Sequence, residues 1–175
     1  MKASQLILLK QKLRYPARVT LAAVLALLAA RILGFPEVYW APVSAVVVTQ
    51  SDFGASLALS LHRLAGTALG ACAGAWLATQ LGRGVFVFGF GVLGTGLLSV
   101  GLRLERPANR FAAIAFTIVF LVVRAEPVWA IALHRFLEVT VGIMAGLVLS
   151  AVWPEPEIGH GPLAPQGRPI KNQSR

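Results

Sequence analysis

Acidic side chains and cysteine are scarce in this chain. Its 175 residues include 7 Asp and Glu and 1 Cys, and charged residues of both signs make up 13% of the total. A soluble domain devotes about a quarter of its residues to charge, so this share is too small for a water-exposed surface. With Cys72 as the single cysteine, disulfides give no information about the cellular compartment.

Several functional motifs are missing as well. The sequence has no GxxxxGK[ST] phosphate loop, which argues against ATP hydrolysis, and no nucleophile–base pair or carboxylate dyad that would support an enzyme. Ligand-type residues are not spaced around His62 or His134, so we expect no metal and no cofactor. Aromatic residues are not interleaved with the basic ones, and the sequence shows no soluble module. Both observations argue against nucleic-acid binding.

What the chain has in abundance is apolar sequence. Hydrophobic residues make up 57% of it, and the mean hydropathy is +0.72. Short charged or Gly/Pro-bearing breaks separate six apolar blocks. The sequence therefore predicts an all-α integral membrane protein with six transmembrane helices in residues 19–153. The blocks are 19–33, 39–49, 64–81, 85–102, 111–123 and 136–153.

The two ends of the chain differ from this middle part. Residues 1–18 are basic and amphipathic and lack a clean cleavage site, which predicts an interfacial helix leading into an uncleaved span. Residues 154–175 are rich in Pro and Gly, which is typical of a disordered tail. Placing both ends in the cytoplasm puts most Lys and Arg residues inside, so we expect an N-in/C-in topology.

A repeated stretch divides the membrane part into two halves. Leu61–Gly74 reads LHRLAGTALGACAG, and Leu133–Gly146, 72 positions later, reads LHRFLEVTVGIMAG. Halves of three spans each, about 19–81 and 85–153, would be inverted relative to one another, because each crossing reverses direction. A gapless alignment pairs Tyr39 with Phe111 and Arg63 with Arg135. Chance similarity between apolar segments is the alternative interpretation.

The second apolar block of each half is short. Residues 39–50 and 111–123 fall below the roughly 20 residues that cross a bilayer, and Pro42 removes a backbone donor from the first of them. Short spans at matched positions point to a midplane binding site. The alternative is that these helices extend through polar residues such as Thr49 and Gln50.

The third span of each half carries a stripe of small residues. Gly66, Gly70 and Gly74 follow Arg63 at helical spacing, and Glu138, Gly142 and Gly146 follow Arg135 in the same way. Glycines at this spacing let helix backbones approach closely in lipid, so the stripes are interpreted as packing faces. We also expect a homodimer, formed either through the Gly66–Gly70–Gly74 stripe or through Gly89, Gly91, Gly94 and Gly96.

The arginines at the head of the stripes are candidates for binding an anion. Two inverted arginines at helix starts would attract a negative group from either face, although anchoring at the interface is the alternative. Glu138 is placed to pair with Arg135, which leaves Arg63 as the stronger candidate contact. Proton coupling through His62, His134, Glu138 or Asp52 is a further hypothesis.

Four segments together resemble a known family: VYWAPVSAVVVTQ from Val38, RLAGTALGACAG from Arg63, RFLEVTVGIMAG from Arg135, and AVWP from Ala151. They are similar to the fusaric acid resistance-like family, which includes aromatic acid exporters. The resemblance implies a six-helix unit in the bacterial inner membrane that exports aromatic or hydrophobic carboxylic acids.

Under that resemblance, Arg63 and Arg135 would hold the carboxylate, with Tyr39, Trp40, Phe111 and Thr67 lining the site. The expected partners are membrane lipid and a small organic anion. Two other functions stay open: a passive anion channel resembling plant malate channels, and a non-transporting scaffold subunit.

Overall fold

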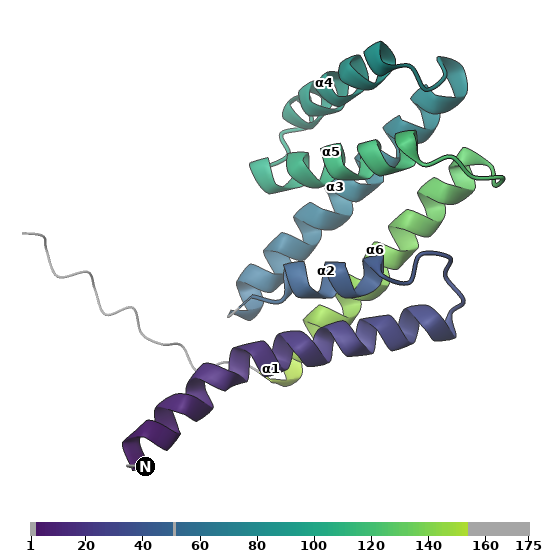
Figure 1. Ribbon diagram of the computed structural model, residues 1–175. Coiled ribbons are helices and arrows are strands. Elements are labelled where there is room, and N and C mark those ends of the chain that lie inside the picture. Colours follow the sequence, from purple (N-terminus) through teal and green to yellow (C-terminus); the bar gives the residue numbers. More distant parts are fainter. Residues whose placement is uncertain (1–2, 51, 154–175) are drawn as a thin grey trace, which may run out of the picture.

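The computed structural model describes residues 3–50 and 52–153, and Figure 1 shows this part of the chain as a set of helices joined by short segments. It contains no strand, so the all-α prediction holds for these residues. The predicted tail, 154–175, lies outside them. The helices are α1 (Ala3–Ile32), α2 (Trp40–Val48), α3 (Phe53–Gln80), α4 (Val85–Gly101), α5 (Arg106–Leu121) and α6 (Val128–Val152).

The helices differ in how well they suit a bilayer. Within the described residues, Leu13–Ile32 and Val128–Val152 are long and apolar enough to cross a membrane, and α4, with 17 residues, is apolar but shorter. The six-span arrangement therefore stays a prediction. The first helix also runs unbroken through Pro16, so no helix end marks the boundary expected at residue 18.

The second helix of each half is short, as the apolar blocks indicate. The 9 residues of α2 rise about 14 Å, roughly half of the hydrocarbon thickness. Pro42 lies in the first turn of α2, where a backbone N–H has no partner within the helix, so the loss of a hydrogen bond expected there does not occur. The fifth helix begins at Arg106, earlier than expected, after its cap residue Glu105.

Glycines bring helices of different halves into backbone contact. A Cβ on Gly70 would collide with the carbonyl oxygen of Ala112 in α5, and a Cβ on Gly142 would collide with that of Ala41 in α2. Each third helix thus packs on the second helix of the other half. The glycines of both stripes therefore lie at close contacts between helices.

This packing also limits how copies of the chain can meet. Gly66, Gly70 and Gly74 are covered by α5, so that stripe is already used within the chain. The ring of Phe116 covers Gly91, whereas Gly89 and Gly94 have no atom within 4 Å of a built Cβ. The homodimer stays a prediction, and the open part of α4 is the face left for it.

The contacts correct the alignment of the short helices. Gly70 and Gly142 are 72 positions apart, but the residues they pack on, Ala112 and Ala41, are 71 apart. The same shift pairs Gly74 on Phe116 with Gly146 on Ala45. The counterpart of Phe111 in the first half is therefore Trp40 and not Tyr39. The stretch from the second helix to the third is one residue longer in the second half than in the first.

Corresponding helices run in opposite directions. Gly66 meets Ala108 and Gly74 meets Phe116, so α3 and α5 run the same way, and α6 and α2 do likewise. Figure 1 shows that the third helices, α3 and α6, run antiparallel. In agreement, Oγ of Ser56 near the start of α3 lies 3.5 Å from Oγ of Ser150 near the end of α6. It follows that α2 and α5 are antiparallel too.

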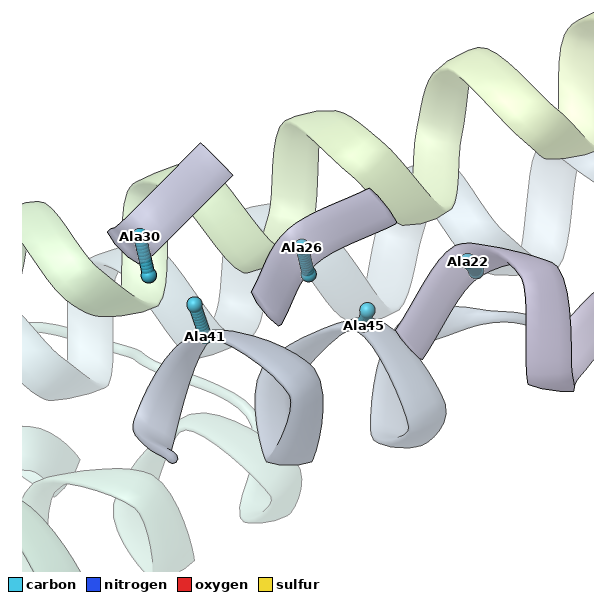
Figure 2. Close-up of a cluster of buried hydrophobic side chains, with 5 residues drawn as sticks. All are labelled: Ala22, Ala26, Ala30, Ala41 and Ala45. Atoms are coloured by element: carbon cyan, nitrogen blue, oxygen red, sulfur yellow. The ribbon is translucent and has the colours of Figure 1, made fainter. Parts of the chain in front are cut away.

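Small residues pack α1 closely onto α2. Figure 2 shows the cluster, in which alanines of the two helices face one another and each is fully buried. The absence of long side chains brings the helices near enough for the alanines to interdigitate. The members are Ala22, Ala26, Ala30, Ala41 and Ala45.

Arginines bind the carbonyl ends of both short helices. Arg18 of α1, 1% exposed, donates from Nη2 to the carbonyl of Gln50 after α2 and from Nη1 to that of Trp153 at 3.1 Å. Arg83 donates to the carbonyls of Phe120 at 2.8 Å and Val122 at 3.2 Å, at the end of α5. A cation at a helix carboxyl end offsets the negative end of its dipole, which stabilises these short helices where they stop.

Candidate binding site around two buried arginines

Arg63 lies inside α3, and two of its three nitrogens donate hydrogen bonds. Nε and Nη2 donate to Oγ of Ser44 in α2 at 3.2 and 3.0 Å, and Cζ lies 4.8 Å from the ring centroid of Phe111. The side chain is buried, 6% exposed. The sequence suggested that Arg63 stands at the start of its helix. It does not, because α3 begins at Phe53, well before the apolar block.

Arg135 is equally buried but lacks such acceptors. It is 3% exposed, and its Cζ lies 3.2 Å from the ring centroid of Trp40. Nε and Nη1 are buried without a hydrogen-bond partner among the described residues. It too lies inside its helix, since α6 begins at Val128, so neither arginine benefits from an N-terminal dipole.

Both arginines converge on α2. Trp40 and Ser44, which they contact, are one turn apart on this helix, and Ser44 Oγ donates to the carbonyl of Trp40 at 2.8 Å. The short helix is thus held between α3 and α6. The sequence predicted that the two arginines act together, and the structure brings them to one element without an ion pair to either in the part of the chain it describes.

The prediction that Glu138 forms an ion pair with Arg135 is wrong. Glu138, 1% exposed, accepts a hydrogen bond from the backbone N–H of Glu37 at 3.0 Å instead. A hydrogen bond to a buried carboxylate is worth about 1.5–3 kcal/mol. The carboxylate therefore binds the segment before α2, and Arg135 has no ion pair among the residues that the structure describes.

Two charged residues next to this site were missed in the sequence. Glu37 is 8% exposed and forms an ion pair with Arg124, 87 positions away, and it accepts a hydrogen bond from Trp40 Nε1 at 2.7 Å. Both stand in breaks between apolar blocks, where charge is expected on a solvated loop. Nothing local to either residue indicates that they meet, because they lie in different breaks 87 positions apart.

These groups line a small polar cavity. Its volume is about 10 Å³, which leaves no room for an organic acid, since even one water molecule needs about 10–15 Å³. The site is therefore closed in this structure. The polar and charged residues around it are Glu37, Arg124, His134, Arg135 and Glu138.

The other residues predicted for substrate binding or proton coupling are spread over several helices. Tyr39 is 53% exposed beside Trp40, and Thr67 is buried one turn after Arg63. Asp52 caps α3, accepting a hydrogen bond from the Ala55 N–H at 2.8 Å. His62 lies 3.4 Å from Glu105.

Of the four residues suggested for coupling, His134 and Glu138 line the polar cavity. His134 Nδ1 is also 3.7 Å from the carboxylate of Glu126.

Two larger hollows in the described part of the chain are largely apolar. One of about 580 Å³ lies between α3 and α4, lined by residues such as Leu69, Trp76 and Phe90, and one of about 310 Å³ lies between α3 and α6. Cys72 borders both. Neither hollow is lined by a charged residue, and such largely apolar walls suit acyl chains.

Comparison with known proteins gives one family and a set of relatives. The model of the fusaric acid resistance protein-like family matches residues 24–149, which include both arginines, Glu37 and Arg124. The chain is similar to the uncharacterized transporter YdhK of Escherichia coli strain K12, with 34% identity over 151 residues, covering 81% of this chain and 22% of YdhK. No solved structure matches the chain.

Two further relatives carry the same name. YdhK of E. coli O157:H7 is 34% identical over 151 residues, again 81% of this chain and 22% of the relative. YdhK of Salmonella typhimurium strain LT2 is 33% identical over 156 residues, 83% of this chain and 23% of the relative. The chain thus spans less than a quarter of the length of these relatives.

Proposed function

Because the chain belongs to the fusaric acid resistance protein-like family, we propose that it exports aromatic or other hydrophobic carboxylic acids across the bacterial inner membrane. The relatives are named as transporters, and not as enzymes, which supports transport as the general activity. The substrate class follows from the chemistry of the site.

The observation that carries the proposal is the state of Arg135. Its guanidinium is buried in an apolar protein, stacked on Trp40, with Nε and Nη1 unpartnered among the described residues. A buried charge without a partner is costly, and a carboxylate satisfies an arginine through two parallel hydrogen bonds. A substrate with an anionic head and an aromatic or aliphatic body fits both the cation and its surroundings.

Arg63 has a supporting part in this proposal. Its Nε and Nη2 both donate to Ser44, so it fixes the position of α2 beside Arg135. The sequence favoured Arg63 as the anion contact because Glu138 was expected to neutralise Arg135. With Glu138 bound to the Glu37 N–H, we assign the first role to Arg135.

The membrane arrangement is proposed on the same basis. We place six membrane segments in two inverted halves with both ends in the cytoplasm. The opposite directions of α3 and α6 support this placement, as do the short helices α2 and α5 at matched positions. In transporters with inverted repeats the site lies where the halves meet near the midplane, and the contacts of Arg63 and Arg135 with α2 support a site between the halves.

The test is benzoate transport in proteoliposomes that contain the purified chain. Arg135→Gln is expected to lower the transport rate at least tenfold, roughly 1.4 kcal/mol or more, because the amide cannot form the paired hydrogen bonds of a guanidinium. Arg31→Gln is the matched control, since Arg31 is exposed in the last turn of α1. Wild-type rates in Arg135→Gln would refute the site.

The same preparation separates a transporter from a channel. A channel would give currents whose reversal potential follows the benzoate gradient alone, insensitive to a proton gradient. A coupled exporter would accumulate benzoate against its gradient when a proton gradient is imposed.

A further inference from the structure

Two hydrogen-bond donors beside Arg135 converge on a single carboxylate. Trp40 Nε1 donates to Oε2 of Glu37 at 2.7 Å, and Arg124 Nη2 binds Oε1 of the same group. One donor comes from the first turn of α2 and the other from the segment between α5 and α6. This is a complete carboxylate-binding arrangement, and here its occupant belongs to the chain itself.

Exposure to solvent falls from Arg124 through Glu37 to Arg135. The side chain of Arg124 is 32% exposed, that of Glu37 is 11% exposed, and Arg135 is 3% exposed. Trp40 connects the two levels, because its Nε1 binds Glu37 while its ring face covers the Arg135 guanidinium. A carboxylate held by Arg124 and Trp40 is therefore already in contact with the side chain that stacks on the inner arginine.

We propose that Arg124 and Trp40 Nε1 form an outer binding site for a carboxylic acid, which Glu37 occupies when no substrate is bound. The inference rests on the proposed function, since it describes how a carboxylate reaches Arg135. The substrate displaces the Glu37 carboxylate from Arg124 and Trp40. Exchange of one carboxylate for another leaves both donors satisfied, and the displaced Glu37 carboxylate must turn toward solvent to be hydrated.

The closed cavity agrees with this role of Glu37. The backbone N–H of Glu37 is bound by Glu138 and its carboxylate by Arg124 and Trp40, so the segment before α2 is fastened at two points over Arg135. Release of the carboxylate leaves the Glu138 contact as the remaining attachment. Glu37 thus competes with substrate, and the apparent affinity is lowered by the fraction of time it occupies the site.

Two substitutions with opposite effects test the proposal in benzoate transport by proteoliposomes. Glu37→Gln removes the competing charge and is expected to lower KM about tenfold, whereas Arg124→Gln removes the outer donor and is expected to raise KM about tenfold with little change in kcat. Glu105→Gln is the matched control, because the Glu105 side chain is 72% exposed and outside the cavity. A KM for Glu37→Gln equal to or above that of wild type overturns the displacement.

A measurement on the unmodified chain covers the case in which Glu37→Gln does not insert. The chain has 4 Trp residues, and the indole N–H resonance of Trp40 is identified by its loss in Trp40→Phe. Benzoate is expected to shift this resonance, with a midpoint near KM, and to leave that of exposed Trp76 unchanged. An unchanged Trp40 resonance at saturating benzoate overturns the proposal.

The two proposals fail in different ways. If neither wild type nor Arg135→Gln moves benzoate or any similar acid, the proposed function is refuted. If wild type transports and Arg135→Gln does not, but Glu37→Gln and Arg124→Gln leave KM at the wild-type value, only the outer site is refuted.

Discussion

Alanine at two glycine positions is expected to change stability in opposite directions. At Gly70 an added Cβ would overlap the Ala112 carbonyl and lie 2.7 Å from its carbon and 2.9 Å from its Cα. These are backbone atoms, so no flexible side chain can give way and α3 must move from α5. At Gly94 a built Cβ has no atom within 4 Å, so alanine meets no obstacle there.

The magnitudes follow from two opposing terms. Overpacking costs about 1–3 kcal/mol, and replacing a helical glycine by alanine gains about 0.8–1 kcal/mol. Because the three nearest atoms to the built Cβ all belong to the Ala112 backbone, we take the upper part of that range and expect a net loss of about 2 kcal/mol. Gly94→Ala keeps only the favourable term and is expected to gain about 0.5–1 kcal/mol.

The assay is unfolding by SDS titration in mild detergent, followed by far-UV circular dichroism. Both variants change glycine to alanine in a helix, so their difference isolates the contact between α3 and α5. Equal free energies of unfolding for Gly70→Ala and Gly94→Ala would show that these helices do not approach as described, and the placement of Arg63 over Phe111 would lose its basis.

Two other predictions concern the ends of the short helices and the direction of the halves. Arg18→Met is expected to lower the free energy of unfolding by about 2–4 kcal/mol, because the carbonyls of Gln50 and Trp153 lose a buried cationic donor. Arg83→Met is expected to lower it by about 1 kcal/mol, because Arg83 is more exposed, and equal losses in the same SDS titration would contradict this. In a Cys72→Ser background, Asp52→Cys and Glu126→Cys, which precede α3 and α6, should react with an impermeant maleimide from opposite faces of the membrane, and labelling of both from one face would refute the inverted arrangement.

Local patterns in the sequence were sufficient for the helices and their packing faces. Glycines at four-residue intervals indicated close helix contacts, and these form at Gly70 and Gly142. The short apolar block from Tyr39 indicated a short second helix, which is 9 residues long. Such features depend on neighbours along one helix, so the periodicity of that helix carries the information.

The site depended on contacts that periodicity does not carry. Glu37 and Arg124 are 87 positions apart, and each stands in a polar break where a solvated charge is the ordinary expectation. The local rule also failed at Glu138, where a pair with Arg135 three residues away was displaced by the N–H of Glu37, 101 positions away. A contact within one helix is visible in the spacing of residues, but a stronger one from another element is not.

The one-residue shift between the halves explains why the two arginines differ. With second helices related by 71 positions, the residue that corresponds to Ser44 is Ala115. Ser44 supplies the hydroxyl that accepts from Arg63, whereas alanine has none to offer Arg135, whose Nε and Nη1 are without partners among the described residues. The two halves share a scaffold of glycines, arginines and aromatic rings. The missing hydroxyl leaves Arg135 without the hydrogen bonds that Ser44 gives Arg63, which is why we propose Arg135 as the anion contact.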